Sequence, residues 1–243
     1  MKRRPALHIV TLSLLFSLST GLAACTTTST HETSSLKPST EWVAHAPDWR
    51  QEALDVYEEA SEYVKIQSEK NSALSWAVIL DLDETVMNNV AYQVARDKAG
   101  LGYTSVSWYE WTQKKQASLV PGAAEFIAFV NQLGGHVAFV TNRRDTEQLA
   151  TEENLAALGL RRSEDFRVLL TKASPNGRSD KTSRFNLVPE ILAAQGYPNV
   201  EVIAFIGDNI GDKPETVKGW KFFCIDQGAM YGEPCAAVPG PGR

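Results

Sequence analysis

The sequence from residue 76 to residue 85 reads Trp76-Ala77-Val78-Ile79-Leu80-Asp81-Leu82-Asp83-Glu84-Thr85. Its first five residues are apolar and show no alternation, which is typical of a strand buried on both faces of a parallel sheet. Asp81 and Asp83 follow directly, so two carboxylates leave the end of this strand together. We interpret the stretch as the reactive centre around which the chain is organised.

Apolar runs and helical patterns alternate along the rest of the chain. This order predicts an α/β fold, in which a right-handed parallel β-sheet is flanked by helices. Residues 86–120 interrupt the order and are expected to form a small cap inserted after the first strand. Pro189 is expected to break a helix that starts at Lys181, leaving a regular part at 188–195. The other expected strands are 136–140, 168–171, 202–206 and 222–226, and the other expected helices are 48–70, 121–134 and 145–159.

Three of the expected strands end in polar residues, which are Asp81, Thr141 and Asp208. Because ligands of open α/β sheets bind outside the carboxyl ends of the strands, we expect these side chains to meet. Asp81 can attack as a nucleophile, and Asp83 can protonate a leaving oxygen and later deprotonate water. Asp208 and Asp212 add carboxylate oxygens, and such ligands suit Mg²⁺.

The other polar groups near these strand ends suit a phosphate. Thr141 offers a hydroxyl group and Asn142 a backbone N–H to phosphate oxygens. A lysine would offset the accumulated negative charge, and Lys181 follows Asp180 at a turn.

Together these motifs resemble the haloacid dehalogenase (HAD) superfamily, and within it the class C acid phosphatases, which are bacterial lipoprotein phosphatases that act on nucleotides. The closer resemblance covers about residues 42–226. The superfamily motifs match Asp81-Leu82-Asp83-Glu84-Thr85, Thr141, Lys181 and Gly207 to Asp212. The closer family resemblance rests on residues 79–85, 120–123 and 140–143, together with Leu22-Ala23-Ala24-Cys25, which resembles a bacterial lipobox.

The resemblance implies a Rossmann-like HAD fold with Asp81 as nucleophile and Asp83 as general acid and base. It also implies that Thr141 and a lysine complete the catalytic set. The lysine that matches is Lys181, but the segment that follows it is a few residues longer than is usual in the family. Lys172 therefore stays as the alternative lysine.

The metal and substrate sites also follow from the resemblance. Magnesium would be held by Asp81, the backbone carbonyl of Asp83, and Asp208, with Asp212 as a ligand through water or as a supporting residue. The expected substrate-binding residues are Thr85 and Asn142 of the motifs, together with Trp108, Tyr109 and Trp111.

The aromatic cluster of the cap has two possible roles. Trp108, Tyr109 and Trp111 would either form the core of a small cap or stack on the substrate. In the family, aromatic residues near this position grip a nucleobase, and Tyr231 is a weaker candidate for the opposite side of that base. The region after Asp226 looks short for the family.

The N-terminus indicates export. A basic start and a short apolar stretch precede Leu22-Ala23-Ala24-Cys25, which resembles a lipobox with Cys25 as the lipidated residue. The alternative is an ordinary signal that is cleaved nearby. Thr26 resembles the outer-membrane sorting pattern, which predicts an outer-membrane lipoprotein facing the periplasm or the cell surface. Residues 26–46 are rich in Ser and Thr and are expected to form a flexible tether.

The net charge argues against a nucleic-acid polymer as partner. It is −5 for the whole chain, and residues 1–24 hold three positive and no negative charges, so their removal gives −8. Residues 47–235 are expected to form the folded domain and residues 236–243 a disordered tail. Export permits a disulfide between Cys224 and Cys235, although two free thiols are the alternative.

We therefore predict a Mg²⁺-dependent phosphomonoester hydrolase of the acid phosphatase type, similar to a 5′-nucleotidase. It would act through an aspartyl-phosphate intermediate on small phosphorylated substrates in the cell envelope, with nucleoside monophosphates as the first candidates. The alternatives are a sugar-phosphate phosphatase or a phosphotransferase on the same site, and a non-catalytic ligand-binding surface lipoprotein. A binding protein has no need of two adjacent reactive carboxylates, which argues against the last alternative.

Overall fold

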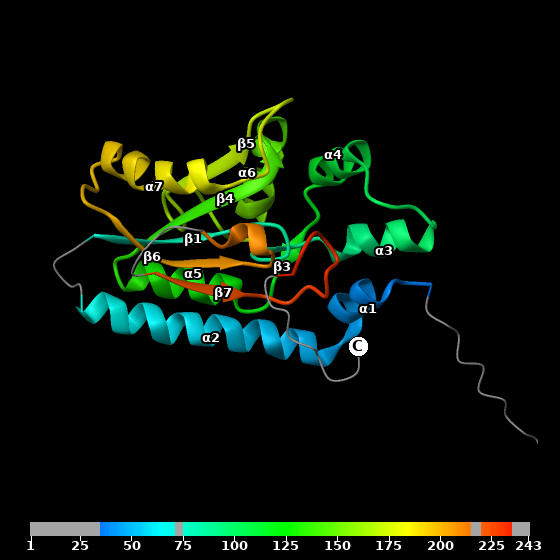
Figure 1. Cartoon of the computed structure of the whole chain (residues 1–243), viewed down its shortest axis with the longest axis horizontal. Helices are drawn as coiled ribbons and strands as arrows, with labels where there is room; N and C mark the ends of the chain where they lie inside the picture. The colour runs from blue at the N-terminus through cyan, green and yellow to red at the C-terminus, as the bar shows by residue number, and fades with distance from the viewer. Residues whose placement is uncertain (1–34, 71–74, 215–219, 235–243) are drawn as a thin grey trace, which may run out of the picture. The chain divides into compact units, whose positions relative to one another are not determined.

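The computed structural model describes residues 35–70, 75–214 and 220–234. Within these ranges, a five-stranded sheet has the order β5-β4-β1-β6-β7, and each neighbouring pair is parallel (Figure 1). The expected parallel α/β architecture is confirmed. The strands are β1 (Trp76–Leu80), β4 (His136–Arg144), β5 (Val168–Lys172), β6 (Glu201–Gly207) and β7 (Lys221–Cys224).

Strand β1 lies at the centre of the sheet because its side chains are apolar on both faces. All five of its residues are buried. Successive side chains of a strand point to opposite faces, so Val78 and Leu80 join one core while Ala77 and Ile79 join the other. This position delivers the end of β1, and the carboxylates that follow it, to the middle of the sheet edge.

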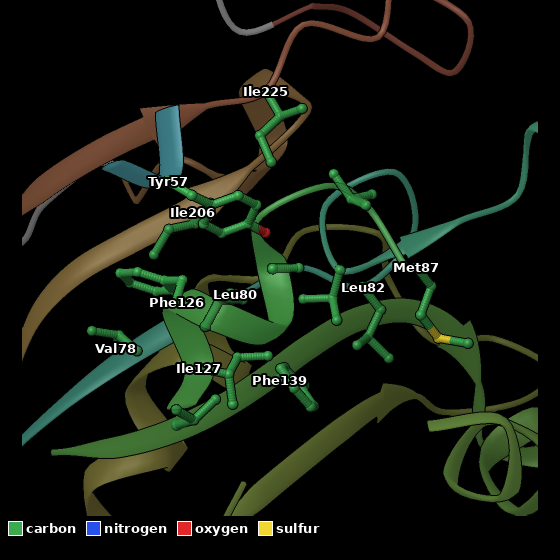
Figure 2. Close-up of a cluster of buried hydrophobic side chains, with 14 of the residues drawn as sticks. Tyr57, Val78, Leu80, Leu82, Met87, Phe126, Ile127, Phe139, Ile206 and Ile225 are labelled. Carbon is green, nitrogen blue, oxygen red and sulfur yellow. The ribbon is translucent and has the colours of Figure 1, made fainter. Parts of the chain in front are cut away.

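Helices cover both faces of the sheet. Helices α2 (Pro47–Lys70) and α5 (Ala123–Gln132) lie along one face in Figure 1, where Tyr57 and Phe126 pack into the core that Figure 2 shows. Leu155 of helix α6 (Gln148–Ala157) belongs to the same core. Helix α7 (Thr182–Ala194) covers the opposite face.

Helix α7 begins earlier than expected. It runs unbroken through Pro189, so the expected restriction to residues 188–195 is wrong. A proline inside a helix costs about 3 kcal/mol. The buried side chains of Phe185, Val188 and Leu192 each contribute roughly 1.5–3 kcal/mol, which outweighs that cost.

The cap follows β1 and is mainly helical. It contains α3 (Val90–Lys98) and α4 (Ser105–Lys114), as expected for residues 86–120. Two short strands, β2 (Met87–Asn88) and β3 (Ser118–Leu119), form an antiparallel pair at its base. This pair ties the two ends of the insertion together where it leaves the sheet.

The expected tether is wrong for its second half. Residues 38–45 form helix α1 (Pro38–His45), in which Thr40 and Val43 are buried. Polar contacts explain the difference: the Thr40 hydroxyl and the Lys37 N–H both donate to the Asp97 carboxylate of α3. Such a contact between residues distant in sequence leaves no local pattern.

Several expectations fall outside the described residues, among them the signal, the lipidation of Cys25, the first part of the tether and the tail. Cys224 is disulfide-bonded, and Cys235 lies outside the described residues. In the ranges that the structure describes, we find no helix whose length and apolar character would let it cross a membrane.

Candidate active site

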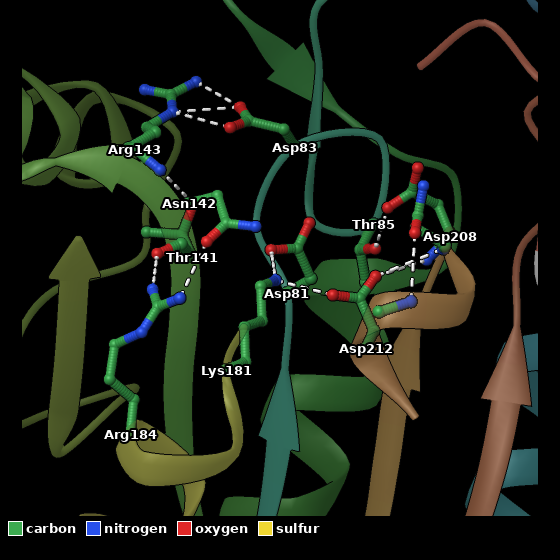
Figure 3. Close-up of polar contacts among 12 residues, drawn as sticks. Asp81, Asp83, Thr85, Thr141, Asn142, Arg143, Lys181, Arg184, Asp208 and Asp212 are labelled. Atoms are coloured by element: carbon green, nitrogen blue, oxygen red, sulfur yellow. Dashed lines mark hydrogen bonds and ion pairs between the residues drawn. The ribbon is translucent and has the colours of Figure 1, made fainter. Parts of the chain in front are cut away.

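The carboxylate of Asp81 lies at the centre of a buried charged cluster. The Lys181 ammonium contacts the Asp81 Oδ1 atom and also lies 2.6 Å from the Asp212 Oδ1 atom (Figure 3). Carboxylate oxygens of Asp81, Asp208 and Asp212 lie within 4.8 Å of one another. The strand-end residues Asp81 and Asp208 therefore meet, as predicted, and the lysine beside them is Lys181 rather than Lys172.

Local structure fixes Lys181 at this point. The residue precedes the first turn of α7, and the Asp180 carboxylate accepts a hydrogen bond from the Thr182 N–H at 2.9 Å. A carboxylate at the start of a helix satisfies a backbone donor that has no partner within the helix. The capped turn directs the Lys181 side chain toward the end of β1.

Burial and mutual repulsion dominate the electrostatics of the cluster. Burial raises the pKa of Asp81 to about 7, a shift that Lys181 opposes and the charges of Asp212 and Asp83 reinforce. Burial also raises the pKa of Asp208 well above its usual value, with Asp212 and Asp81 adding to the effect. For Lys181, burial opposes the charge, but the two carboxylates beside it raise its pKa.

The chemistry of this donor set fits a divalent cation. Three carboxylates are 5–8% exposed, and one ammonium group cannot neutralise them. Buried charges require compensation, and oxygen donors suit hard cations such as Mg²⁺. Burial first, and the neighbouring carboxylates second, raise the pKa values of Asp81 and Asp208, and a bound cation would offset both effects.

Asp212 acts differently from the other two carboxylates. Its Oδ1 atom faces Lys181, while its Oδ2 atom accepts the N–H groups of Asp208 at 3.3 Å and Asn209 at 3.1 Å. Gly207 makes this approach possible, because a Cβ atom there would overlap the Asp212 side chain. With both oxygens engaged, Asp212 is better suited to support Asp208 than to bind a cation directly.

Asp83 points away from the cluster and toward Arg143 (Figure 3). The Arg143 Nε and Nη2 atoms donate to the Asp83 Oδ1 atom at 2.9 and 2.7 Å. The Asn89 side-chain amide donates to the same oxygen at 2.9 Å, and the Trp111 indole N–H donates to the Asn89 Oδ1 atom at 2.8 Å. A buried polar network thus links the second carboxylate to the cap.

Sequence reasoning missed the role of Arg143. Arg143 is 2% exposed, and its side chain also donates to the Thr151 hydroxyl at 3.1 Å. The sequence did contain a signal for this role, because Arg143 directly follows the strand-end pair Thr141-Asn142 and so lies close to the buried edge of the sheet. A buried arginine requires an anionic partner. The structure identifies Asp83 as that partner.

Glu84 was also missed. It adopts a left-handed backbone conformation, with φ 61°, and is 1% exposed. Its Oε1 atom accepts the Asn89 N–H at 2.7 Å, while its Oε2 atom has no hydrogen-bond partner among the residues that the structure describes. Burial, followed by the charge of Asp83, raises the pKa of Glu84.

The two predicted threonines lie behind the site rather than on it. Thr85 is fully buried and its hydroxyl donates to the Asp208 Oδ1 atom at 3.4 Å, so the expected direct contact with substrate is wrong. Thr141 is equally buried, and its hydroxyl accepts the Arg143 N–H at 3.1 Å. Neither residue lines the cavity described below.

A cavity of about 520 Å³ opens above these carboxylates. Its volume matches that of small-molecule sites. It is lined by Asp81, Asp83, Glu84, Tyr103, Trp108, Asn142, Arg143, Lys172, Lys181, Asp208, Asn209, Gly211, Asp212, Met230, Tyr231 and Gly232.

The three residues of the aromatic cluster differ in whether they line the cavity. Trp108 lines it, and the Tyr231 ring lies 6.0 Å from the Trp108 ring, centroid to centroid. Trp111 is buried and holds Asn89, and Tyr109 is 44% exposed without lining the cavity, so the expected substrate contact of these two residues is wrong. Tyr103, which sequence reasoning missed, also lines the cavity.

A second arginine, Arg184, supports the end of β4. Its Nη1 atom donates to the Thr141 carbonyl, and its Nη2 atom donates to the Asn142 Oδ1 atom at 2.7 Å. This contact holds Asn142 at the cavity wall, where the sequence placed a phosphate contact. Arg184 lies three residues after Lys181, one helical turn along α7.

The family model described as "HAD superfamily, subfamily IIIB (Acid phosphatase)" matches residues 11–234. A class C acid phosphatase structure from Bacillus anthracis is 24% identical, with a TM-score of 0.66 over 80% of this chain and 84% of that chain. A second structure of that enzyme, with tungstate bound, matches at 23% identity, with the same TM-score and coverage. These likenesses confirm the fold.

Curated relatives match a smaller part of the chain. The stem 28 kDa and 31 kDa glycoproteins of Glycine max are each 27% identical over 139 residues, which is 55% of this chain. The match covers 51% and 44% of those proteins. The chain thus spans about half the length of the curated relatives that it matches.

Proposed function

The chain belongs to subfamily IIIB of the HAD superfamily, the acid phosphatases, and on this premise we propose that it is a Mg²⁺-dependent phosphomonoesterase that forms an aspartyl-phosphate intermediate. One observation carries the proposal. The Lys181 ammonium lies between the carboxylates of Asp81 and Asp212, at the floor of a cavity that Asp83 and Asp208 also line.

The two carboxylates of the first motif have separate partners and therefore separate tasks. Asp81, beside Lys181, attacks phosphorus, and the bond to the leaving oxygen breaks. Asp83, held by Arg143, donates the proton that the leaving oxygen takes up. Asp83 then removes a proton from water, whose oxygen attacks the phosphorus of the intermediate and restores the Asp81 carboxylate.

Lys181 and a bound cation would both offset the negative charge that gathers at the site during this reaction. Lys181 offsets the negative charge of Asp81 as it approaches a phosphate that is itself negative. Asp81, Asp208 and the backbone carbonyl of Asp83 would hold Mg²⁺, with Asp212 supporting Asp208. When bound, the cation supplies electrostatic stabilisation of the transferring phosphoryl group.

The cavity walls support a nucleoside monophosphate as substrate. Trp108, Tyr103 and Tyr231 give the cavity aromatic surfaces, and aromatic side chains stack on bases of any sequence. The location that we propose, an outer-membrane lipoprotein anchored through Cys25, is supported by the sequence pattern alone. At that location the enzyme would remove phosphate from nucleotides in the cell envelope.

Phosphate release from the full chain tests the proposal. The substrates are adenosine 5′-monophosphate and glucose 6-phosphate, each assayed with Mg²⁺ or with a chelator. We expect Mg²⁺-dependent release, faster from the nucleotide, and its loss in Asp81→Asn. The matched control is Asp55→Asn, since Asp55 is an exposed residue of α2.

The outcomes separate the alternatives. Release from neither substrate would leave the non-catalytic lipoprotein, and faster release from the sugar phosphate would favour a sugar-phosphate phosphatase. Transfer of the phosphate to added glycerol would identify a phosphotransferase. Equal rates for wild type and Asp81→Asn would refute the mechanism.

A further inference from the structure

Basic side chains in the cavity wall (Arg143, Lys172 and Lys181) and next to it (Arg144 and Arg184) fall into two groups that differ in their partners. Lys181 pairs with Asp81 and Asp212, and Arg143 pairs with Asp83. In contrast, Arg144, Lys172 and Arg184 form no ion pair with any carboxylate in the part of the chain that the structure describes. This second group lies toward β5, on one side of the catalytic cluster.

Arg144 and Lys172 stand directly opposite each other in the sheet. They are register partners at the ends of β4 and β5. Like charges in this position repel each other and destabilise a sheet. The buried Glu147 carboxylate, which accepts the Arg144 N–H at 3.0 Å, offsets part of this repulsion but forms no ion pair with either side chain in the described chain. Burial lowers the pKa of Lys172, the nearby charges of Arg144 and Arg184 lower it further, and the charge of Glu147 opposes this shift only in part.

The contacts of these residues leave donors free. Lys172 Nζ has a single hydrogen bond within the described chain, at 3.4 Å to the Ser179 hydroxyl, and the Arg144 side chain donates to the Ser105 hydroxyl at 3.3 Å. Both contacts are long and exposed. Arg184, by comparison, is occupied by the Thr141 carbonyl and the Asn142 amide oxygen.

Lys172 lies too far along the sheet edge to repeat the task of Lys181. Strand β4 separates β5 from β1, and two strand spacings amount to about 9–10 Å. Lys172 nevertheless lines the same cavity as Asp81. A molecule whose phosphate is attacked by Asp81 can therefore bring a second group of its leaving part to Lys172.

We propose that Lys172, with Arg144 beside it, forms a second anion subsite that binds a phosphate group on the leaving group of the substrate. The chemical class is a bisphosphorylated small molecule, such as a nucleoside 3′,5′-bisphosphate. The inference deepens the proposed function and rests on it for the identity of the scissile phosphate. An ammonium group is a compact phosphate-binding charge, and a second phosphate would relieve the repulsion between the two cations.

Binding to a variant that does not turn over tests the subsite apart from the activity. The full chain with Asp81→Asn is titrated with adenosine 5′-monophosphate and with adenosine 3′,5′-bisphosphate by calorimetry. We expect the bisphosphate to bind roughly tenfold more tightly, as a charge-assisted hydrogen bond would give. Lys172→Met in this background should bring the two dissociation constants together.

Two further variants control for charge and for folding. Lys172→Arg keeps the positive charge and should keep the preference for the bisphosphate. Lys65→Met removes a charge from an exposed position of α2, away from the cavity, and should leave the preference unchanged.

Equal affinity of the Asp81→Asn protein for the two nucleotides would overturn the subsite. So would an equal weakening of both nucleotides by Lys172→Met, which would place Lys172 on the scissile phosphate. If the Asp81→Asn protein shows a preference that depends on Lys172 while the wild-type protein releases no phosphate from any substrate, the subsite is supported and the proposed activity is refuted. The two failures are therefore distinguishable.

Discussion

Arg143 holds the carboxylate of Asp83 through two guanidinium nitrogens and is itself almost fully buried. A lysine at this position would keep the charge but lose the forked geometry. We predict that Arg143→Lys lowers kcat/KM on an alkyl phosphate by about 10²-fold, since general acid catalysis contributes at least that much. Steady-state kinetics on glycerol phosphate measures this loss.

The leaving group distinguishes lost proton transfer from general damage. The nitrophenolate released from p-nitrophenyl phosphate needs no proton, so Arg143→Lys should lower kcat/KM, which reports only the steps up to phosphoenzyme formation, much less for that substrate. Arg162→Lys is the matched control, because Arg162 forms a comparable forked pair with Glu152 on the surface. An equal loss of kcat/KM on both substrates would show that Arg143 does not support proton donation by Asp83.

At the scale of elements, helix α1 depends on one carboxylate of α3. Asp97 accepts hydrogen bonds from the Thr40 hydroxyl at 2.6 Å and from the Lys37 N–H at 3.0 Å. We predict that Asp97→Asn lowers the free energy of unfolding by about 1–3 kcal/mol, since hydrogen bonds to a charged group are lost. Urea unfolding measures the change, and hydrogen exchange should show faster exchange in α1.

The same contact predicts a pH dependence. Burial raises the pKa of Asp97, but the hydrogen bonds from Thr40 and Lys37 outweigh burial and lower the pKa overall. A lowered pKa in the folded state gives stability that is complete above the ordinary aspartate pKa, and this stability is lost as the pH falls through the lowered value. The difference between wild type and Asp97→Asn should therefore shrink in acid, and a constant difference would contradict this account.

The elements that were predicted correctly from the sequence have a clear local pattern of apolar residues. The apolar run of β1 and the helical spacing in α2 were sufficient to place both. The elements that were missed depend on distant contacts. Helix α1 needs Asp97, and α7 continues through Pro189 because its apolar side chains pack on the sheet.

At the scale of the whole molecule, topology explains why part of the site was predictable. Parallel strands place Asp81 and Asp208 at the same edge of the sheet, independently of the loop conformations. The positions of the strand ends are therefore enough to predict that these two residues lie close together. The partners of these carboxylates were harder to predict. Arg143 finds Asp83 only after β4 and the loop after β1 are placed side by side, and Trp111 reaches Asn89 only within the folded cap.

The repulsion among three buried carboxylates predicts that a cation stabilises the whole fold. Mg²⁺ at about 100 times its dissociation constant should add about 2.7 kcal/mol to the free energy of unfolding. For a domain of this size the melting temperature should rise by roughly 5–10 °C. Calorimetry with and without Mg²⁺ measures the rise.

Asp208→Asn should abolish most of that rise, because the variant removes a direct oxygen ligand of the proposed metal site. Asp55→Asn should retain it, since Asp55 lies on the exposed side of α2. A melting temperature that does not respond to Mg²⁺ in wild type would contradict the metal site.

Chemical trapping of the intermediate tests the central claim, covalent attack by Asp81. The full chain is mixed with Mg²⁺ and a nucleoside monophosphate, quenched in acid and reduced with borohydride, which converts an aspartyl phosphate to homoserine. Mass spectrometry of the digested protein should find homoserine at position 81, and Asp81→Asn should show none. Steady phosphate release without modification at position 81, or with modification at another carboxylate, would contradict the account.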